Sequence, residues 1–436
     1  MPYLKIHCIN TLCSYARLLF NNKIGNNMYS NRNIVHFDLD TFFVSVERLR
    51  NSKLNGIPVA VGGNSDRAVV ATCSYEARAF GVHSGMAVKI AKRLCPQILM
   101  IQGDMEMYSK YSRVVTEIVH AQVPLYEKSS IDEFYIDMSG MDKYFGCAQY
   151  VSQLKKTIVK ESGLPISYGL SANKLVSKVA TGQGKPNGQL VVPHGQEKIF
   201  LAPLPIHKIP MIGNKTAELL NKMGVETVAT LSQIPEQYLM NLLGKNGMEI
   251  HRRANGIDET PVIPYQEQKS ISTEETFDKD TIDVQYIYSE LARMCERIAY
   301  ELRSQNKLSG CITVKIRYSN FDTITKQMTI PYTANTSTMQ AKVRALFDKL
   351  YDRRLLIRLI GVRLSNLVQG SYQISIFDDT QEQISLYQSI DHLKKRFGAD
   401  VLMSARSIIT KKTKRHNNIG HYDVTSFGSR KLITNY

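Results

Sequence analysis

The feature that most constrains the fold is a pair of adjacent acids, Asp132 and Glu133, inside the string SSIDEF at residues 129–134. Successive side chains on an extended strand point to opposite faces of a sheet. Both carboxylates can therefore reach one site only where the backbone turns. The polar and apolar residues around them alternate, so we expect a β-hairpin with the two acids at its tip.

A second acidic string lies far upstream, where an apolar run leads into Asp38 and Asp40. Such a run predicts a buried strand that delivers a carboxylate to an open edge. We expect Asp38 to meet Asp132 and Glu133 at one point. Three clustered carboxylates repel one another unless hard cations neutralise them, and Mg²⁺ or Mn²⁺ suits an all-oxygen site. The alternative is that each acid is a solvated turn residue, and the rest of the chain must decide.

Composition narrows the class of protein. At 436 residues the chain is long enough for roughly three domains or more. A net charge of +16 would repel itself in the folded state, so a polyanion, with nucleic acid first, is the expected partner. Seven cysteines without a C-x-x-C pair argue against a disulfide framework or a zinc site and favour a reducing cytoplasm. No apolar run reaches the ~18 residues of a membrane span.

No acid precedes Asp38. An acid-poor leader can be a transit peptide, but residues 1–34 are rich in Asn and lack a clean amphipathic repeat. Met28 lies shortly before the first predicted strand. We therefore favour an extension outside the fold over a targeting segment.

Two stretches carry groups that could hold phosphates. Residues 67–85 predict a strand that runs into a helix, and hydroxyls, a guanidinium and helix N–H groups at that junction suit a polyphosphate. These groups belong to Thr72, Tyr75 and Arg78. The Gly-rich stretch 182–188 predicts a loop whose Lys185 could reach a phosphate, although a lone loop lysine is usually solvated.

The first half of the chain predicts a βαββαβ order, an α+β sheet with helices on one face. Helices are expected over 105–122 and 147–161, and a strand over 166–170. A further helix should start at a cap, Ser171 or Asn173, and run through Val179.

Short helices follow from Pro193. Residues 206–220 and 239–255 read as helical hairpins with tight Gly turns, which can present helix N–H groups to a DNA phosphate. The alternative is an ordinary αα-hairpin. A polar linker over 261–268 should then lead into a second α+β module.

In that module, strands are expected over 271–277, 311–332 (a long hairpin) and 358–367, with helices over 286–305 and 339–351. The hairpin alternates apolar and cationic residues, so one face should be basic and suited to the DNA backbone. We expect this face to carry Lys315, Arg317, Lys326 and Arg363. A merely solvated face is the alternative. Further on, a packed helix is expected from the spacing of Leu386, Ile390, Leu393 and Phe397.

Five strings, FDLDTFF, SYEAR, SSIDEF, YGLSANKLVSKVA and GKPNG, stand in the order and at separations typical of one family. From Asn33 to Leu367 the chain resembles the Y-family DNA polymerases, the DinB and UmuC group of translesion enzymes. The resemblance implies an α+β multidomain fold: a βαββαβ palm with inserted fingers, a helical thumb with helix-hairpin-helix elements, and an α+β little finger. The implied bounds are palm 33–41 and 104–192, fingers 42–103, thumb 193–262 and little finger 263–369, between an extension (1–32) and a clamp-binding tail (370–436).

The resemblance also implies roles. Asp38, Asp132 and Glu133, with the Leu39 carbonyl, would hold two Mg²⁺ or Mn²⁺ ions. Phe43 resembles the steric gate against a ribose 2′-hydroxyl, and Phe42 would lie beside the same nucleotide. Triphosphate contacts would come from Thr72, Tyr75, Arg78 and Lys185. The string QISIF is similar to a sliding-clamp peptide, anchored by Gln373, Ile376 and Phe377.

The implied activity is template-directed, low-fidelity DNA synthesis past lesions, because no segment is left over for a proofreading exonuclease. Its partners would be primer-template DNA, deoxynucleoside triphosphates and a sliding clamp, for a cytoplasmic monomer without a membrane partner. Two departures stand out: Thr41 replaces an aromatic of some members, and the first thumb hairpin reads MIGNKT without G-x-G. A palm-type nucleotidyl cyclase and a catalytically silent DNA- or clamp-binding subunit are the competing interpretations.

Overall fold

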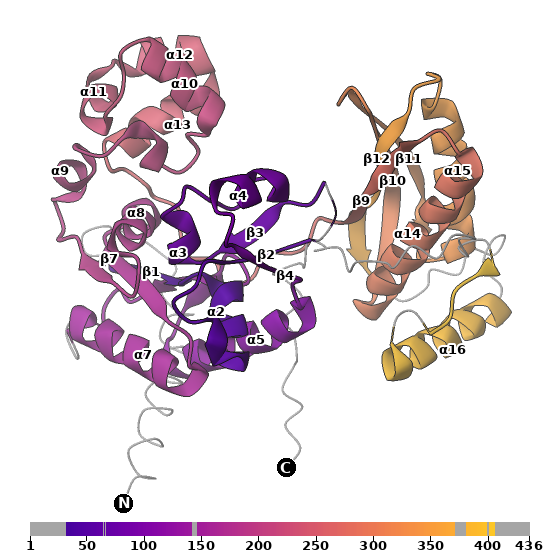
Figure 1. Cartoon of the computed structure of the whole chain (residues 1–436), viewed down its shortest axis with the longest axis horizontal. Coiled ribbons are helices and arrows are strands. Elements are labelled where there is room, and N and C mark those ends of the chain that lie inside the picture. Colours follow the sequence, from indigo (N-terminus) through magenta and orange to yellow (C-terminus); the bar gives the residue numbers. More distant parts are fainter. Residues whose placement is uncertain are drawn as a thin grey trace, which may run out of the picture. The chain divides into compact units, whose positions relative to one another are not determined.

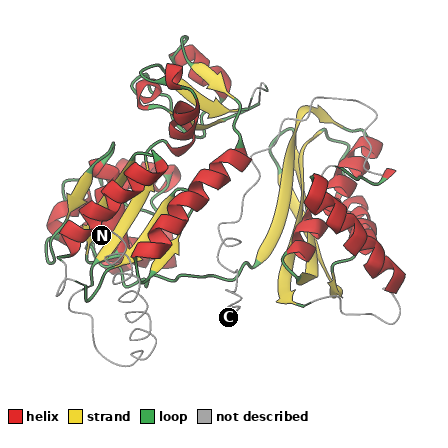
Figure 2. Ribbon diagram, turned by 90° about the horizontal axis from the view of Figure 1, so that it is seen from below, coloured by secondary structure: helices red, strands yellow, loops and turns green. Residues whose placement is uncertain are grey.

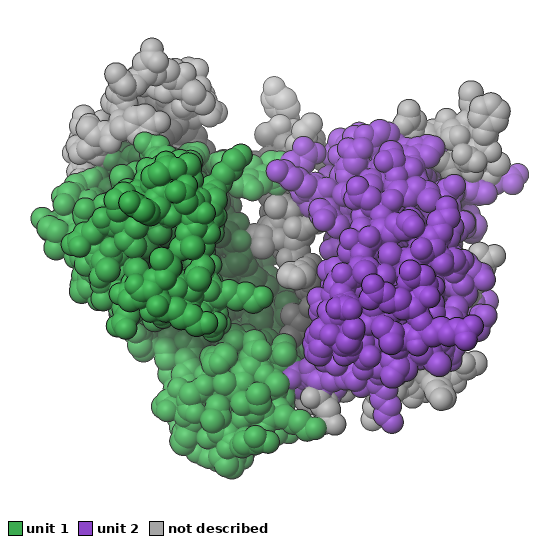
Figure 3. All heavy atoms as spheres, turned by 90° about the horizontal axis from the view of Figure 1, so that it is seen from above, with its two compact units in different colours: residues 1–62, 69–266 green, residues 63–68, 267–436 purple. Residues whose placement is uncertain are grey.

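The computed structural model describes residues 32–63, 65, 67–141, 146–370, 381–398 and 401–405. The chain divides into two compact units, residues 1–62 with 69–266 and residues 63–68 with 267–436, coloured green and purple in Figure 3. The boundary falls within the linker predicted over 261–268. Among the helices of the described ranges, none has the length and apolar character needed to cross a bilayer.

The first unit is built on a five-stranded sheet in the order β5–β6–β1–β7–β8. The central strand β1 is antiparallel to both neighbours, while β7 and β8 are parallel. These strands are β1 (Ile34–Leu39), β5 (Tyr126–Lys128), β6 (Glu133–Asp137), β7 (Ile166–Ser171) and β8 (Gln189–Val191).

Alternation along β1 gives the sheet two different faces. Val35, Phe37 and Leu39 are buried in the core that α5 (Met105–Gln122) and α7 (Cys147–Ser162) cover. These two helices lie together on one side of the sheet in Figure 1, away from α8 (Lys174–Gly184). Because side chains alternate, His36 and Asp38 belong to the α8 face. The predicted βαββαβ order is confirmed, but the helices were expected on one face only, whereas α8 covers the other.

The helix α8 packs very closely on the sheet. A Cβ at Gly169 would collide with the carbonyl oxygen of Ser177, so only glycine fits there. The cap is Asn173, whose side chain accepts a hydrogen bond from the Val176 N–H at 2.9 Å. The helix runs to Gly184, past the predicted end at Val179, so the predicted loop 182–188 begins as its last turn.

A smaller sheet in the order β3–β2–β4 is inserted between β1 and α5. Its elements are α2 (Phe42–Arg50), a 3₁₀ turn (Ser52–Leu54), β2 (Val59–Gly62), β3 (Val70–Cys73), α3 (Tyr75–Arg78), α4 (Val88–Leu94) and β4 (Leu99–Ile101). The strand and helix predicted within 67–85 correspond to its β3 and the α3 that follows.

Short helices complete the first unit, as predicted from Pro193 onward. Gly244, with φ of +64°, joins α12 to α13 in the second predicted hairpin. In the first hairpin Met211 adopts φ of +77°. The elements are α9 (Glu197–Leu201), a 3₁₀ turn (Ile206–Lys208), α10 (Asn214–Lys222), α11 (Val228–Gln233), α12 (Glu236–Leu243) and α13 (Lys245–Ala254).

The second unit has a four-stranded antiparallel sheet in the order β11–β10–β12–β9. Its two long helices lie on one side of this sheet, as Figure 2 shows. The alternation predicted for the hairpin is present, because Ile312, Val314 and Ile316 are buried on the helix side. The elements are β9 (Ser270–Thr281), α14 (Val284–Ser304), β10 (Lys307–Tyr318), β11 (Thr323–Thr333), α15 (Thr336–Leu350) and β12 (Ile357–Gln369).

The C-terminal helix α16 (Gln381–Phe397) forms as predicted, but the expected buried face was wrong. The packed side of α16 carries the buried Ile384 together with Asp391, and Arg303 donates to both Asp391 oxygens at 2.6 and 2.8 Å. The same guanidinium lies 4.8 Å from the ring centre of Tyr387. The ion pair and ring contact therefore orient the helix. Of the predicted stripe, three side chains are exposed: Leu386 (56%), Leu393 (39%) and Phe397 (59%).

Candidate active site

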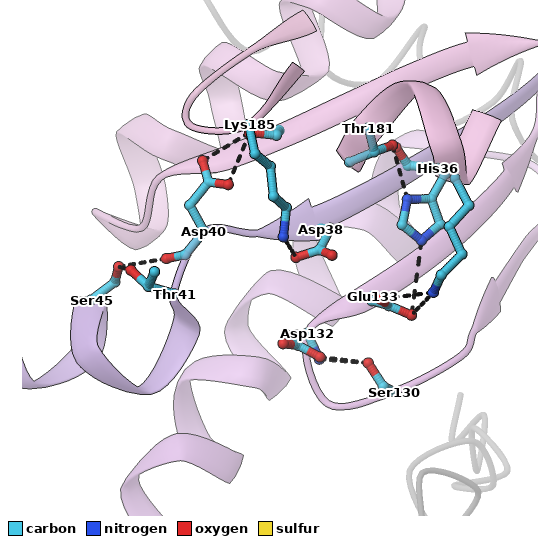
Figure 4. Close-up of polar contacts among 12 residues, drawn as sticks. His36, Asp38, Asp40, Thr41, Ser45, Ser130, Asp132, Glu133, Thr181 and Lys185 are labelled. Atoms are coloured by element: carbon cyan, nitrogen blue, oxygen red, sulfur yellow. Dashed lines mark hydrogen bonds and ion pairs between the residues drawn. The ribbon is translucent and has the colours of Figure 1, made fainter. Parts of the chain in front are cut away.

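The backbone brings the two acidic strings together. Asp38 on β1 is paired in register with Glu133 on β6, and the Leu39 N–H donates to the Asp132 carbonyl oxygen at 3.0 Å. Asp132 lies in the turn between β5 and β6, so the expected hairpin tip is confirmed. Figure 4 shows the three carboxylates around the adjoining ends of β1 and β6.

Two lysines hold two of these acids. The Lys185 ammonium pairs with Asp38, and Lys178 of α8 donates to both Glu133 oxygens at 2.9 and 2.7 Å. Within the described ranges, no three His, Cys, Asp or Glu side chains are grouped so that they could hold one metal ion. The backbone thus brings the three acids to adjoining positions, as expected, while the side chains of Asp38 and Glu133 are engaged by the two lysines.

The electrostatics are those of a crowded acidic site. Burial raises the pKa of Asp38 to about 7. Lys185 lowers this pKa, while repulsion from Asp132 and Glu133 adds to the increase. Burial also raises the pKa of Asp132, although Ser130 donates a hydrogen bond to it at 2.5 Å. Carboxylates are hard oxygen donors, so this donor set fits Mg²⁺ or Mn²⁺.

His36 lies two residues before Asp38 on the same face and was not predicted as part of the site. Thr181 donates its hydroxyl hydrogen to a backbone carbonyl, so it accepts from the His36 Nδ1 at 2.9 Å. The Nε2 atom then carries a lone pair, 3.9 Å from the Glu133 carboxylate.

Burial lowers the pKa of His36 to about 4, so the ring is neutral at pH 7. Burial alone would raise the pKa of Glu133, but the charge of Lys178, which donates to both carboxylate oxygens, holds the pKa below its usual value. Because His36 is neutral, the cation that stabilises the Glu133 carboxylate is Lys178. The contact of Lys178 depends on how α8 packs on the sheet, so no local sequence signal marks it.

The predicted nucleotide contacts lie on elements of the first unit. Phe42 is buried, while the Phe43 ring stacks on Tyr108 at 4.3 Å between centroids and 14° between planes. Thr72 lies on β3. Tyr75 and Arg78 lie on α3, with the guanidinium 5.0 Å from the tyrosine ring centre. The predicted strand-to-helix junction is therefore confirmed, and Lys185 contacts Asp38.

The second unit separates the four predicted DNA-binding cations. Thr313, Lys315 and Arg317 are spaced by two along β10, so they point to the same face, opposite the helices. Arg363 on β12 pairs directly with Thr313 and therefore lies on that face too. Lys326 was placed wrongly. It pairs with the buried Val314 and its ammonium reaches the Lys349 carbonyl oxygen at 3.5 Å, at the end of α15.

We define the basic sheet face as Lys315, Arg317 and Arg363. It is rich in Thr and Ser, and Lys315 pairs there with Glu274. The predicted clamp residues Gln373, Ile376 and Phe377 lie outside the described residues.

Comparison with known proteins gives consistent matches. Residues 37–182 match a family described as impB/mucB/samB, residues 268–376 match its C-terminal domain, and residues 195–225 match its HHH motif. A DNA polymerase IV from Dehalococcoides mccartyi is 36% identical over 380 residues, which cover 86% of this chain and 97% of that protein. One from Listeria monocytogenes is 36% identical over 343 residues, 78% of this chain and 96% of that protein.

A solved structure is also similar. A Y-family DNA polymerase chimera of Dbh and Dpo4 superposes with a TM-score of 0.69 at 25% sequence identity. The match covers 78% of this chain and 100% of the chimera.

Proposed function

Since the chain belongs to the impB/mucB/samB family of Y-family, DinB-type DNA polymerases, we propose that it extends DNA primers past lesions with Asp38, Asp132 and Glu133 as its catalytic acids. The observation that carries this proposal is the register of β1 and β6, which pairs Asp38 with Glu133 beside Asp132. A nucleotidyl cyclase would leave the basic sheet face unexplained. A catalytically silent binding subunit would leave the paired acids unexplained.

The three carboxylates, with the Leu39 carbonyl, would hold two Mg²⁺ or Mn²⁺ ions. Such ions, when bound, lower the pKa of a primer 3′-hydroxyl and stabilise charge on the attacking and leaving oxygens. The chain supplies the negative charge that gathers them. Because Lys185 and Lys178 now balance Asp38 and Glu133, the three acids would hold ions only where both lysines released their carboxylates. Lys185 is then free for an incoming triphosphate.

The sugar and phosphates of the nucleotide would meet different residues. Phe43, fixed against Tyr108, would exclude a ribose 2′-hydroxyl, with Phe42 supporting it. Thr72, Tyr75, Arg78 and Lys185 would contact the triphosphate. Phe43→Ala should then admit ribonucleotides, and an unchanged sugar preference would remove this role from Phe43.

DNA would be held by backbone contacts. The helix α10 begins after Gly213 without a side-chain cap, which leaves N–H groups for a phosphate. The basic sheet face would bind further phosphates. We assign the palm to 33–41 and 104–192, the fingers to 42–103, the thumb to 193–262 and the little finger to 263–369.

We further propose a cytoplasmic, monomeric enzyme that binds a sliding clamp through Gln373, Ile376 and Phe377. In support of a reducing compartment, five described cysteines are free. Pull-down by the clamp should be lost in Gln373→Ala and Phe377→Ala variants, and retention in both would reject the peptide. A sedimentation mass of twice the chain would reject the monomer.

The central experiment is primer extension with Mg²⁺ on undamaged and abasic templates. The wild-type protein should extend both. Asp132→Asn should abolish extension and leave DNA affinity within about twofold, because Asp132 would act in chemistry rather than in DNA binding. An inactive wild type, or an Asp132→Asn protein that still extends primers, would contradict the assignment.

A further inference from the structure

Asp40 is a buried acid that the proposed chemistry does not use. It is 1% exposed and lies at the end of β1, two residues after Asp38. The Ser167 hydroxyl lies 2.9 Å from each carboxylate oxygen, the Asn187 N–H donates to Oδ2 at 2.7 Å, and the Tyr75 hydroxyl lies 3.5 Å from Oδ1. A buried carboxylate is tolerated only when such donors surround it.

The backbone of Asp40 is fixed as well. Its N–H donates to the Pro165 carbonyl oxygen at 2.9 Å, and its carbonyl accepts from the Ser45 hydroxyl at 2.7 Å. The next residue, Thr41, adopts φ of +44°, a rare conformation for a β-branched residue. The carboxylate is therefore held in one place by its own main chain.

One partner of Asp40 is the loop that carries Lys185. The Gly188 N–H donates to the same Ser167 hydroxyl at 3.1 Å, so the loop is joined to Asp40 twice, directly through Asn187 and indirectly through Ser167. From the other side, the Lys155 ammonium of α7 donates to the carbonyl oxygens of Asn187 and Gly188 at 2.6 and 3.2 Å. The loop is thus held between an anion and a cation.

The other partner, Tyr75, begins α3 in the inserted sheet region. Tyr75 and Lys185 are 110 residues apart in the chain, yet the Asp40 side chain contacts both the Tyr75 hydroxyl and the loop of Lys185. No metal-ion or nucleotide contact is needed for this arrangement, because all of its hydrogen bonds are within the protein.

We propose that Asp40 is a positioning residue that sets Tyr75 and the Lys185 loop in place for a nucleotide's phosphates before the nucleotide binds. The proposal rests on the function proposed above, in which Tyr75 and Lys185 contact the triphosphate. Asp40 touches no reacting atom. Its loss would leave the loop to be ordered by the nucleotide itself, and the ordering cost would weaken nucleotide binding.

The first test is amide hydrogen exchange of the protein without DNA or nucleotide. Asp40→Asn leaves one acceptor oxygen in place of two and removes the negative charge, so the side chain cannot accept from both Tyr75 and Asn187. Exchange at Asn187 and Gly188 should therefore rise about tenfold. Ser167→Ala, a milder change, should raise exchange chiefly at Gly188. Ser152→Ala is the matched control, because its hydroxyl contacts Gln189 and not Asp40, and should change neither amide. Unchanged protection in both Asp40→Asn and Ser167→Ala would overturn the proposal.

The second test is nucleotide kinetics. In Asp40→Asn the KM for a deoxynucleotide should rise about tenfold while kcat changes less, since positioning precedes chemistry. A fall in kcat at unchanged KM would overturn the proposal. If the wild type does not extend primers, the proposed function fails, and hydrogen exchange still decides whether Asp40 holds the loop.

Discussion

At the scale of single residues, the buried His36 makes the folded state sensitive to pH. Its pKa is lowered to about 4 in the folded protein, from an ordinary value of 6.5. Between these values the unfolded chain binds a proton that the folded chain does not. Folding stability contributed by the neutral ring is therefore present above pH 6.5 and lost as the pH falls towards 4.

The variant His36→Gln removes this titration. The free energy of unfolding of the wild type minus that of the variant should grow by up to about 3 kcal/mol from pH 4 to pH 6.5, measured by urea unfolding. The difference between the two proteins is needed because Asp38 also makes stability depend on pH. Its raised pKa lowers the free energy of unfolding as the pH rises from about 4 to 7, in both proteins. A difference that does not vary with pH would show that His36 titrates normally.

The acidic residues of the candidate site could be predicted from the sequence, but the side chains that contact them could not. Adjacent carboxylates in a turn and a D-x-D string are local patterns, so Asp38, Asp132 and Glu133 could be predicted. The partners Lys178 and His36 depend on how α8 packs and on which face of β1 each residue occupies. For His36 the signal was available, since it precedes Asp38 by two residues on one strand. Lys185 was assigned to a phosphate, and its contact with Asp38 was not foreseen.

At the scale of elements, the turn before α10 stores backbone strain at Met211. Its φ of +77° is costly for a residue with a Cβ, by roughly 1–2 kcal/mol. Its side chain is 54% exposed, so removing it sacrifices little packing. Met211→Gly should raise the free energy of unfolding by about 0.5–1 kcal/mol, after the entropy of the more flexible unfolded chain is subtracted.

Met223 provides the matched control. It is 59% exposed and has φ of −92°. Because glycine relieves no strain there, Met223→Gly should be neutral or destabilising in the same denaturant titration. Equal effects of the two substitutions would mean that φ at position 211 carries no cost.

The bounds of elements with strong periodicity were predicted to within a residue or two. The contacts that these elements make were not predicted. The helices over 105–122 and 147–161 follow from clear apolar spacing. Lys326 was expected on the basic face, but its pairing with Val314 turns it to the helix side, and strand register cannot be read from one strand alone. In α16 the stripe of Leu386, Leu393 and Phe397 suggested burial, whereas the side that packs carries Ile384 and the ion pair of Asp391 with Arg303.

At the scale of the whole molecule, the net charge of +16 must act through particular surfaces. A triple variant of the basic sheet face, Lys315→Gln with Arg317→Gln and Arg363→Gln, should weaken DNA binding. The slope of log Kd against log salt should fall by up to about 0.9 for each phosphate that the variant no longer neutralises. Fluorescence anisotropy with primer-template DNA at several salt concentrations would measure both effects.

Lys326→Gln is the control for this surface, because the side chain lies on the opposite face. It should leave the salt slope unchanged. A slope that falls as much in Lys326→Gln as in any one change on the basic sheet face would mean that net charge alone, rather than this surface, binds DNA.

The division of the chain was also visible in the sequence. The polar, Pro-containing stretch 261–268 contains the boundary between the two units, since linkers have a distinctive composition. The family strings indicated the activity because they are long and ordered. Side-chain positions within the acidic site could not be predicted, since they depend on which cations, lysine or metal, balance the acids.

The most direct measurement is the anomalous scattering of Mn²⁺ in crystals of the protein with primer-template DNA and an unreactive deoxynucleotide analogue. Two ions should lie among the carboxylates of Asp38, Asp132 and Glu133, with Lys185 and Lys178 released from Asp38 and Glu133. Ions bound away from these three acids, or two ions retained in an Asp132→Asn protein, would contradict the assignment of the active site.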